Sequence, residues 1–236
     1  MVKYPTRSFD QDCYQLIPSR FPPVDVYERL ELPELRAAAL ELEQRTNPRL
    51  TAMKHLSVPP KVRDKGTHQF QNWNHAPFAY KNPEGSHFLG PAYGAAEMAV
   101  DLPAALLHAL RRREEFFSRT NEEAMGQDMR VLCRRVTGTL IDLTGLDTGL
   151  AQAERWNIGQ KLYEEGAAGI IYRRPDFGDH RFVSVYDGAL LGRALQGAHY
   201  RFVWDGKTVK SIYDFNKGDT ILREQLLAAS LGKNAA

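Results

Sequence analysis

Hydrophobic residues between Leu102 and Phe117 recur at the three- and four-residue spacing of an amphipathic helix. Asp101 precedes them and can accept hydrogen bonds from the first turn, where Pro103 is tolerated. The pattern predicts a helix from Leu102 to about Arg119, with one side packed against the core. The apolar stripe consists of Leu102, Ala105, Leu106, Ala109, Leu110, Phe116 and Phe117.

Three other segments carry helix signals. They run from Pro33 to Thr46, from Ala151 to Glu165 and from Thr220 to Leu231. The second ends at Gly166, a residue type that readily adopts the left-handed conformation after a helix. The third follows Asp219, whose side chain can cap a first turn.

Strand signals are spread over the rest of the chain. The first stretch, Tyr14–Pro23, is predicted to be a short strand that ends at prolines, which impose extended backbone without continuing a ladder. An Asp205-Gly206 pair between alternating residues predicts a hairpin. The other predicted strands cover Met129–Val136, Thr139–Leu143, Gly169–Tyr172 and Arg181–Tyr186, and the hairpin joins Tyr200–Trp204 to Thr208-Val209.

Helices and strands follow each other without regular βαβ alternation, which favours an α+β fold over a doubly wound sheet. With 236 residues, the chain is expected to form a single domain. Residues 51–91 are predicted to be a long ordered loop region rich in proline and aromatic residues. The other parts of the domain are a strand and helix (13–50), a core (92–217) and a C-terminal helix (218–236).

Charge and cysteine content narrow the function classes. Lysine and arginine total 31 against 29 acidic residues, so the net charge of +2 provides no strong field for nucleic acid or an anionic membrane. The two cysteines, Cys13 and Cys133, have no disulfide framework and are expected to be free thiols. No apolar run approaches the roughly 18 residues of a membrane span. We therefore expect a soluble cytoplasmic protein.

Familiar catalytic motifs do not occur, but histidines are candidates for chemistry. His87 lies in the aromatic loop region, and His108 falls about 130° from the centre of the apolar stripe, toward a groove edge or solvent. No histidines have the i, i+4 spacing of a helical metal site, so no metal is expected. The run Arg111–Arg113 is followed by Glu114-Glu115, which favours a solvated helix face over a phosphate-binding patch.

Five segments in order resemble the RES family, the toxin component of bacterial toxin–antitoxin pairs. The match covers roughly residues 14 to 215 and includes the following segments. They are Tyr14–Pro23; Asn82–Phe88 with Tyr93-Gly94; Leu102–Phe116; Gly159, Leu162-Tyr163 and Gly166 with Gly169–Tyr172; and Gly197–Tyr200 with Trp204–Gly206.

The resemblance implies a fold similar to ADP-ribosyltransferases, with a split mixed β-sheet and surrounding helices. It also implies NAD as substrate or ligand in a cleft of that sheet, followed by cleavage of the nicotinamide–ribose bond or transfer of ADP-ribose. The implied partners are an Xre-type antitoxin protein and a small-molecule nucleotide, with a homodimer as a further possibility. Neither nucleic acid nor a membrane is an expected partner.

Several functional positions depart from the RES pattern. His87 stands where the family has arginine, Glu97 where it has tyrosine, and His108 where it has glutamate. Arg174 stands where it has serine, and Gln15 where it has arginine. The resemblance therefore makes His87, Glu97 and His108 the candidate catalytic residues. The candidate nucleotide-binding residues are Arg173, Arg174, Gln15 and Tyr172.

Two functions follow from these departures. In an NAD-consuming enzyme with a rewired site, Glu97 supplies the carboxylate, an arginine holds the phosphates, and His87 or His108 provides acid–base chemistry. In a pseudoenzyme, the fold only binds a partner protein or nucleotide. A common pocket for the three candidate catalytic residues is the structural requirement of the enzyme hypothesis.

Each candidate also has an ordinary structural explanation. His87 can simply anchor its loop after Gly85, and Glu97 can be a surface residue of an edge strand. Arg173 and Arg174 can be solvated at the end of a strand. Trp73 and Trp204 are expected to serve in packing rather than in stacking on a base.

Overall fold

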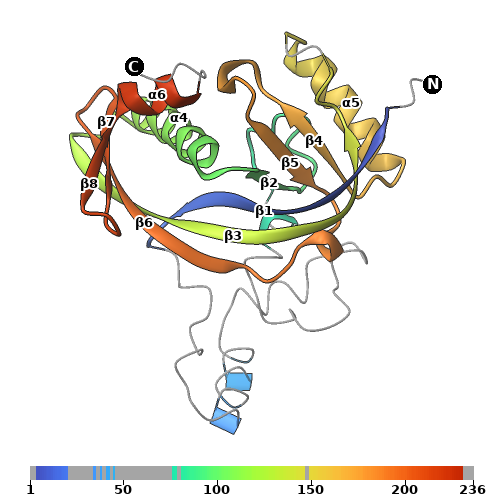
Figure 1. Ribbon diagram of the computed structural model, residues 1–236, viewed down its shortest axis with the longest axis horizontal. Helices are drawn as coiled ribbons and strands as arrows, with labels where there is room; N and C mark the ends of the chain where they lie inside the picture. Colours follow the sequence, from blue (N-terminus) through green and yellow to red (C-terminus); the bar gives the residue numbers. More distant parts are fainter. Residues whose placement is uncertain are drawn as a thin grey trace.

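The computed structural model describes residues 4–20, 34–35, 38, 41–42, 45, 76–78, 81–146 and 149–230. Its elements form one mixed sheet with helices packed on it (Figure 1). In chain order they are β1 (Thr6–Pro18), β2 (Ala96–Ala99), α4 (Leu102–Thr120), β3 (Met125–Asp142), α5 (Gln152–Glu164), β4 (Gly169–Arg173), η2 (Pro175–Phe177), β5 (Arg181–Val185), η3 (Gly188–Leu190), β6 (Leu195–Trp204), β7 (Val209–Asp214), β8 (Asp219–Leu222) and α6 (Arg223–Ser230).

Five strands close into a ring. The sheet order is β1-β2-β5-β4-β3-β6-β7-β8, and β1 also pairs along its whole length with β3. The ring therefore runs β1-β2-β5-β4-β3 and back to β1. Strand β2 connects β1 to β5 in this ring, because it pairs with β1 at Tyr14 and with β5 along Ala96–Ala99.

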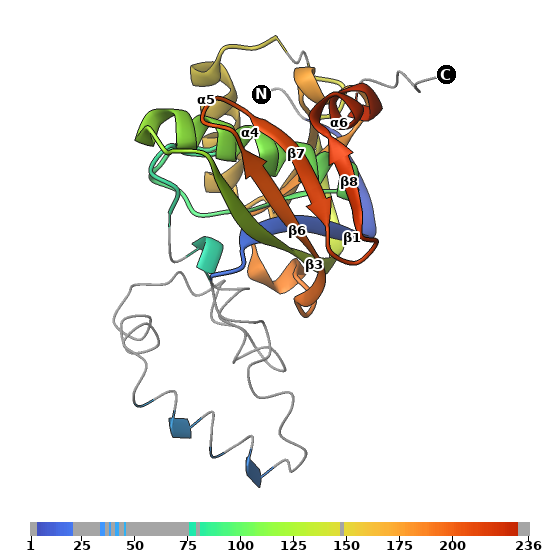
Figure 2. The same cartoon turned by 90° about the vertical axis from the view of Figure 1, so that its left-hand side faces the viewer.

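The long strand β3 divides its second edge between two partners. Its first half pairs antiparallel with β6, and its last residues, Ile141 and Asp142, pair parallel with β4. Strands β6, β7 and β8 extend the sheet away from the ring, with α6 beside them (Figure 2). The sheet is consequently mixed, and the α+β class predicted from the sequence is confirmed.

Two hydrophobic clusters fill the molecule. The cluster associated with the ring strands includes Phe9, Cys13, Met98 and Val183, all at most 3% exposed. The larger cluster lies between the sheet and helix α4, which sits on the concave side of the curved strands β3 and β6 (Figure 1). Among the described residues, no helix is long and apolar enough to cross a membrane.

The helix predicted after Asp101 is confirmed. Asp101 caps α4, because its carboxylate accepts a hydrogen bond from the Ala104 amide at 2.9 Å. The predicted apolar stripe is wrong at Phe116, which is 46% exposed, and it omits the fully buried Leu107. The buried arc is wider than one stripe because α4 packs against β1, β2, α6 and β7.

Helix α5 and the hairpin also agree with the sequence prediction. Gly166 follows α5 with a positive φ of 84°, and Gly206 turns the β6–β7 hairpin at φ 96°. Trp204 is buried against Phe117, as its packing role predicts. Both cysteines are free thiols, Cys13 buried and Cys133 partly so.

Three predicted elements need correction. The first strand begins at Thr6 rather than Tyr14, because residues 6–13 also pair with β3, along Arg134–Ile141. The strands predicted on either side of Gly138 form the single strand β3, in which Gly138 pairs with Phe9. The last helix starts at Arg223, since the preceding four residues form β8 against β7, and Asp219 is therefore not its cap.

Parts of two predicted segments lie outside the described residues. Within the predicted helix Pro33–Thr46, the described residues Glu34, Leu35, Ala38, Glu41, Leu42 and Arg45 are helical and exposed. The loop region 51–91 is described only at residues 76–78, which are helical, and at 81–91, which form turns and irregular chain. Trp73 lies outside the description.

The irregular segment before β2 is held by close contact with α5. The indole Nε1 of Trp156 donates a hydrogen bond of 2.8 Å to the Ser86 carbonyl. Gly159 permits this approach, because a Cβ there would lie 1.8 Å from the Phe88 carbonyl oxygen. Contacts with α5 thus hold residues 82–89 in place, and the close approach leaves no room for a side chain larger than that of glycine at position 159.

Replacing Gly159 with alanine tests this contact. We expect Gly159→Ala to lower the free energy of unfolding by about 1–3 kcal/mol, the usual cost of overpacking. Gly145→Ala is the control, since no atom lies within 4 Å of a Cβ at that position. Urea denaturation measures both variants, and equal stability of the two would contradict the close approach.

Candidate functional site

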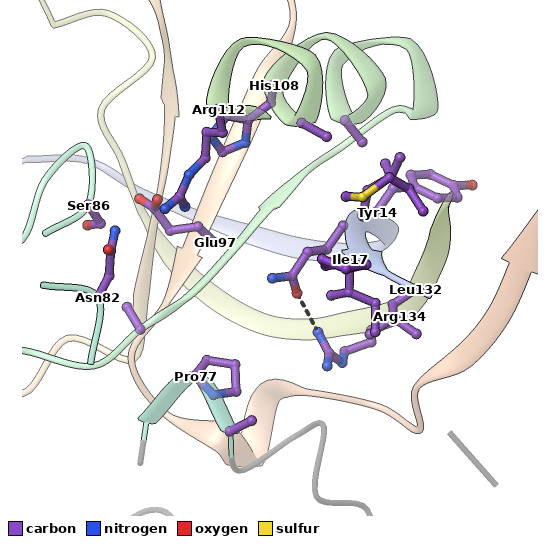
Figure 3. Close-up of a pocket in the computed structure, with 18 of the residues that line it drawn as sticks. Tyr14, Ile17, Pro77, Asn82, Ser86, Glu97, His108, Arg112, Leu132 and Arg134 are labelled. Carbon is purple, nitrogen blue, oxygen red and sulfur yellow. Dashed lines mark hydrogen bonds between the residues drawn. The ribbon is translucent and has the colours of Figure 1, made fainter. Parts of the chain in front are cut away.

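Two adjoining cavities of about 320 and 410 Å³ open between the segment 82–89, strand β2 and helix α4. Figure 3 shows the residues that line the first of them. Both are lined by the same central residues, so they form two lobes of one site. The shared residues are Asn82, Gly85, Ser86, Glu97, His108 and Arg112. We refer to the 410 Å³ cavity as the polar lobe and to the other as the inner lobe.

The two lobes differ in character. The polar lobe is completed by charged and polar side chains, namely His87, Glu84, Glu115, Arg119, Gln152, Arg155 and Arg174. The inner lobe is mixed in character and reaches the end of β1 and the middle of β3, where the apolar side chains of Leu16, Ile17, Met129 and Leu132 share its wall with polar ones. A ligand filling both lobes would therefore have one polar and one less polar end.

Glu97 lies where the lobes meet. Its Oε1 atom accepts a hydrogen bond from the His87 amide at 3.2 Å and another from the Tyr172 hydroxyl at 3.1 Å. Its Oε2 atom accepts none from the residues that the structure describes. Strand β2 is paired on both sides, so the suggestion that Glu97 belongs to an edge strand is wrong.

His87 is half-buried beside Glu97. Its imidazole stacks on the Tyr172 ring, with centroids 5.2 Å apart and planes 10° from parallel. Burial first, and then the positive charges of Arg174 and Arg155, lower the pKa of His87 to about 3. The side chain is consequently neutral at physiological pH. His87 anchors its loop through its backbone and also lines the polar lobe with its ring.

His108 reaches the site from α4, at the cavity edge predicted by its helical position. Its ring meets Phe177 and Phe182 edge-on, with centroids 6.2 and 5.8 Å away. Burial, followed by the nearby Arg174, lowers its pKa well below the usual value for histidine. His108 is therefore also neutral, and does not repel a cation that develops in the cavity.

The two arginines after β4 have different environments. Arg173 is 44% exposed and pairs with Asp179 at 3.4 Å, outside both lobes, as a solvated residue would. Arg174 lines the polar lobe, with its guanidinium 4.7 Å from the centre of the Phe177 ring. Its buried Nε atom has no hydrogen-bond partner among the described residues. Of the pair, only Arg174 can contact a ligand there.

Gln15 lies in the wall of the site, whereas Tyr172 lies behind it. Gln15 lines the inner lobe and accepts a hydrogen bond of 3.1 Å from Nη1 of Arg134, drawn in Figure 3. Arg134 is 1% exposed, and burial lowers its pKa to about 10. Tyr172 is fully buried, so it reaches the site through Glu97 and His87 rather than by lining the cavity.

The sequence prediction missed several residues that line the site. Arg112 and Arg113 belong to the basic run assigned to a solvated face, yet both line the inner lobe. Arg112 follows His108 by four residues, and this spacing on one helix face was the signal that could have found it. Arg155 on α5 carried no such signal. It lines the polar lobe and donates to the His87 carbonyl at 3.3 Å.

The assembled site favours an anionic ligand. Arg112 and Arg174 take part in no hydrogen bond or ion pair with other described residues, and both face the cavity. Arg119 is engaged with Glu84 and Glu115, so it contributes less free charge. No group of three or more histidine, cysteine or acidic side chains gathers as for a metal within the described part of the chain.

Comparison with known proteins gives a relative by sequence and a similar solved structure. No family model matches the sequence. A chain in the crystal structure of the M. tuberculosis MbcT–MbcA toxin–antitoxin complex is similar at a TM-score of 0.44 and 12% identity, over 85% of this chain and 87% of that one. The chain is also 40% identical over 219 residues to the uncharacterized protein y4oC of Sinorhizobium fredii, covering 93% and 94% of the two chains. It belongs to the y4oC family.

The lowered pKa of His87 predicts how the stability of this y4oC-family protein depends on pH. The unfolded chain binds a proton at His87 near pH 6.5, whereas the folded protein binds it near pH 3. The titration of His87 therefore does not lower the free energy of unfolding above pH 6.5. As the pH falls from 6.5 toward 3, the unfolded chain binds a proton that the folded protein does not, and the free energy of unfolding decreases by no more than about 1.4 kcal/mol per pH unit.

We expect His87→Gln to reduce this loss. Urea denaturation of both proteins at pH 7.5 and 5.0 should show the wild type losing more stability than the variant. Between pH 7.5 and 8.5 their difference should stay constant, because the imidazole is neutral in both states there. Parallel curves at all pH values would mean that His87 is not buried as described.

Proposed function

We propose that this protein is a RES-type, toxin-like enzyme that binds NAD or a related dinucleotide in the two-lobed cavity and cleaves its nicotinamide–ribose bond. The observation that carries the proposal is the placement of Glu97. Its carboxylate is anchored through one oxygen at the junction of the lobes, in a site where Arg112 and Arg174 face the same space. The resemblance to the RES family supplies the substrate class.

The chemistry needs both kinds of charge. As the bond between the nicotinamide nitrogen and the ribose carbon breaks, its electron pair leaves with nicotinamide and the ribose becomes an oxocarbenium ion. The Glu97 carboxylate stabilises that cation and can accept a hydrogen bond from a ribose hydroxyl at Oε2. Water then adds to the ribose carbon and loses a proton, which gives ADP-ribose. Phosphate can add to the same carbon in place of water. Arginines hold the diphosphate.

The histidines are better suited to shaping the cavity than to moving protons. A base with a pKa of about 3, as for His87, is almost never protonated at neutral pH and is a weak proton acceptor. A neutral His87 still stacks on Tyr172 and presents ring nitrogens to a ligand. We therefore assign His87 and His108 to hydrogen bonding and packing, and the electrostatic role to Glu97.

The decisive experiment measures nicotinamide released from NAD by the purified protein, by chromatography with and without phosphate. Release above a denatured control is expected. Glu97→Gln should lower the rate about 10²–10³-fold, because it removes the negative charge while keeping an oxygen that can accept the same hydrogen bonds. Glu123→Gln, an exposed position outside the cavity, is the matched control and should retain the wild-type rate.

Arg174 and Arg173 offer a second, sharper comparison. In a Glu97→Gln background, which spares the NAD, titration calorimetry should show Arg174→Ala raising the Kd for NAD about tenfold. Arg173→Ala removes the same charge one residue away and should change the Kd less than twofold, because its side chain pairs with Asp179. Equal effects of the two variants would exclude the polar lobe as the phosphate site.

A pseudoenzyme is the second candidate, and one observation favours it. The positions at which the RES family has a charged arginine and a glutamate carry the neutral imidazoles of His87 and His108. In that case NAD binds and no nicotinamide is released. The resemblance further implies a toxin neutralised by an Xre-type partner protein, and this partner stays a prediction alongside a homodimer and a cytoplasmic location.

A further inference from the structure

Two buried hydroxyl groups lie beside Glu97 and belong to neither lobe. Ser184 on β5 is the cross-strand partner of Glu97, so their side chains share one face of the sheet. Tyr186 follows two residues later, which places it on the same face. Ser184 is 0% and Tyr186 4% exposed. Neither residue lines either lobe, so both lie behind Glu97 as seen from the ligand site.

These hydroxyls interact with each other and with the Glu97 charge, but only at a distance. Neither has a hydrogen-bond partner within 3.5 Å among the described residues. Burial and then the negative charge of Glu97 raise the pKa of Tyr186, while a polar interaction with Ser184 opposes that rise. Two hydroxyl donors and one carboxylate therefore lie close to one another in the interior.

Leaving two buried hydroxyls unpaired is costly, which is why such groups are nearly always satisfied. An internal water molecule needs two to four polar partners, and the two hydroxyls with the Glu97 carboxylate make three. The water can accept hydrogen bonds from Ser184 and Tyr186 and donate one to the carboxylate. Tyr172 already donates a hydrogen bond of 3.1 Å to Oε1 of Glu97 from β4, the strand next to β5.

We propose that Ser184 and Tyr186 are positioning residues that hold the Glu97 carboxylate through one shared internal water. Together with Tyr172, they fix the rotamer of Glu97 so that Oε2 faces the ligand. The catalytic meaning of this arrangement rests on the proposed function. The arrangement itself concerns only the orientation of one side chain, and can be tested without turnover.

The variants are Tyr186→Phe, Ser184→Ala and their double variant, with Tyr163→Phe as the matched control. Tyr163 packs on Tyr186 with ring centroids 5.4 Å apart, so the control removes the same hydroxyl one ring away. Each protein is labelled for NMR of the Glu97 side-chain carboxyl carbon, and its melting temperature is measured. Nicotinamide release is measured as kcat and KM.

We expect Tyr186→Phe and Ser184→Ala each to shift the Glu97 carboxyl resonance and to lower the melting temperature. The double variant should lower it by less than the sum, because both hydroxyls bind the same water. A loss of kcat of about tenfold with little change in KM is expected, the size of one hydrogen bond to a charged group. Tyr163→Phe should leave the resonance and kcat unchanged.

The opposite results overturn the proposal. If the hydroxyls have no shared partner, removing either relieves an unpaired buried group, so the melting temperature rises and the Glu97 resonance stays in place. If the wild type releases no nicotinamide, the proposed function fails, whereas the resonance and the non-additive melting temperatures still decide whether Ser184 and Tyr186 position Glu97.

Discussion

The two hydrogen bonds to Oε1 of Glu97 join three parts of the chain. One comes from the backbone of His87 in the irregular segment before β2, and the other from Tyr172 on β4. Glu97 itself lies on β2, the strand through which β1 and β5 become members of one ring. The position of the carboxylate therefore depends on ring closure, and the shape of both lobes depends on that position.

Electrostatics inside the site follow from burial. Desolvation acts first on His87 and His108, and the neighbouring Arg174 strengthens the effect on both. Two groups that could have carried positive charge are therefore neutral, and the positive charge of the cavity comes from guanidinium groups. The site combines a fixed anion with cations around neutral walls, an arrangement suited to a ligand that is anionic at one end and becomes cationic at another.

The departures from the RES pattern can be understood in the same terms. An arginine at position 87 would stand beside Arg155 and Arg174, where a third cation would be repelled. In this chain, Arg112 and Arg174 provide the charge from α4 and from the end of β4 instead. The carboxylate likewise comes from β2 rather than from α4, where His108 stands. In the proposed function, the charges therefore come from other elements than the resemblance to the RES family implies.

Local signals were enough to predict the capped helix α4, the end of α5 at Gly166 and the hairpin at Asp205-Gly206, because each is specified by neighbouring residues. The α+β class also came from the sequence, and the resemblance singled out His87, Glu97, His108 and Arg174, which line one cavity in the structure. Tertiary structure alone decided that β3 runs through Gly138, that residues 219–222 form a strand, and that Arg112, Arg155, Ser184 and Tyr186 gather around Glu97. Those outcomes depend on pairing between residues far apart in the chain, which no local pattern encodes.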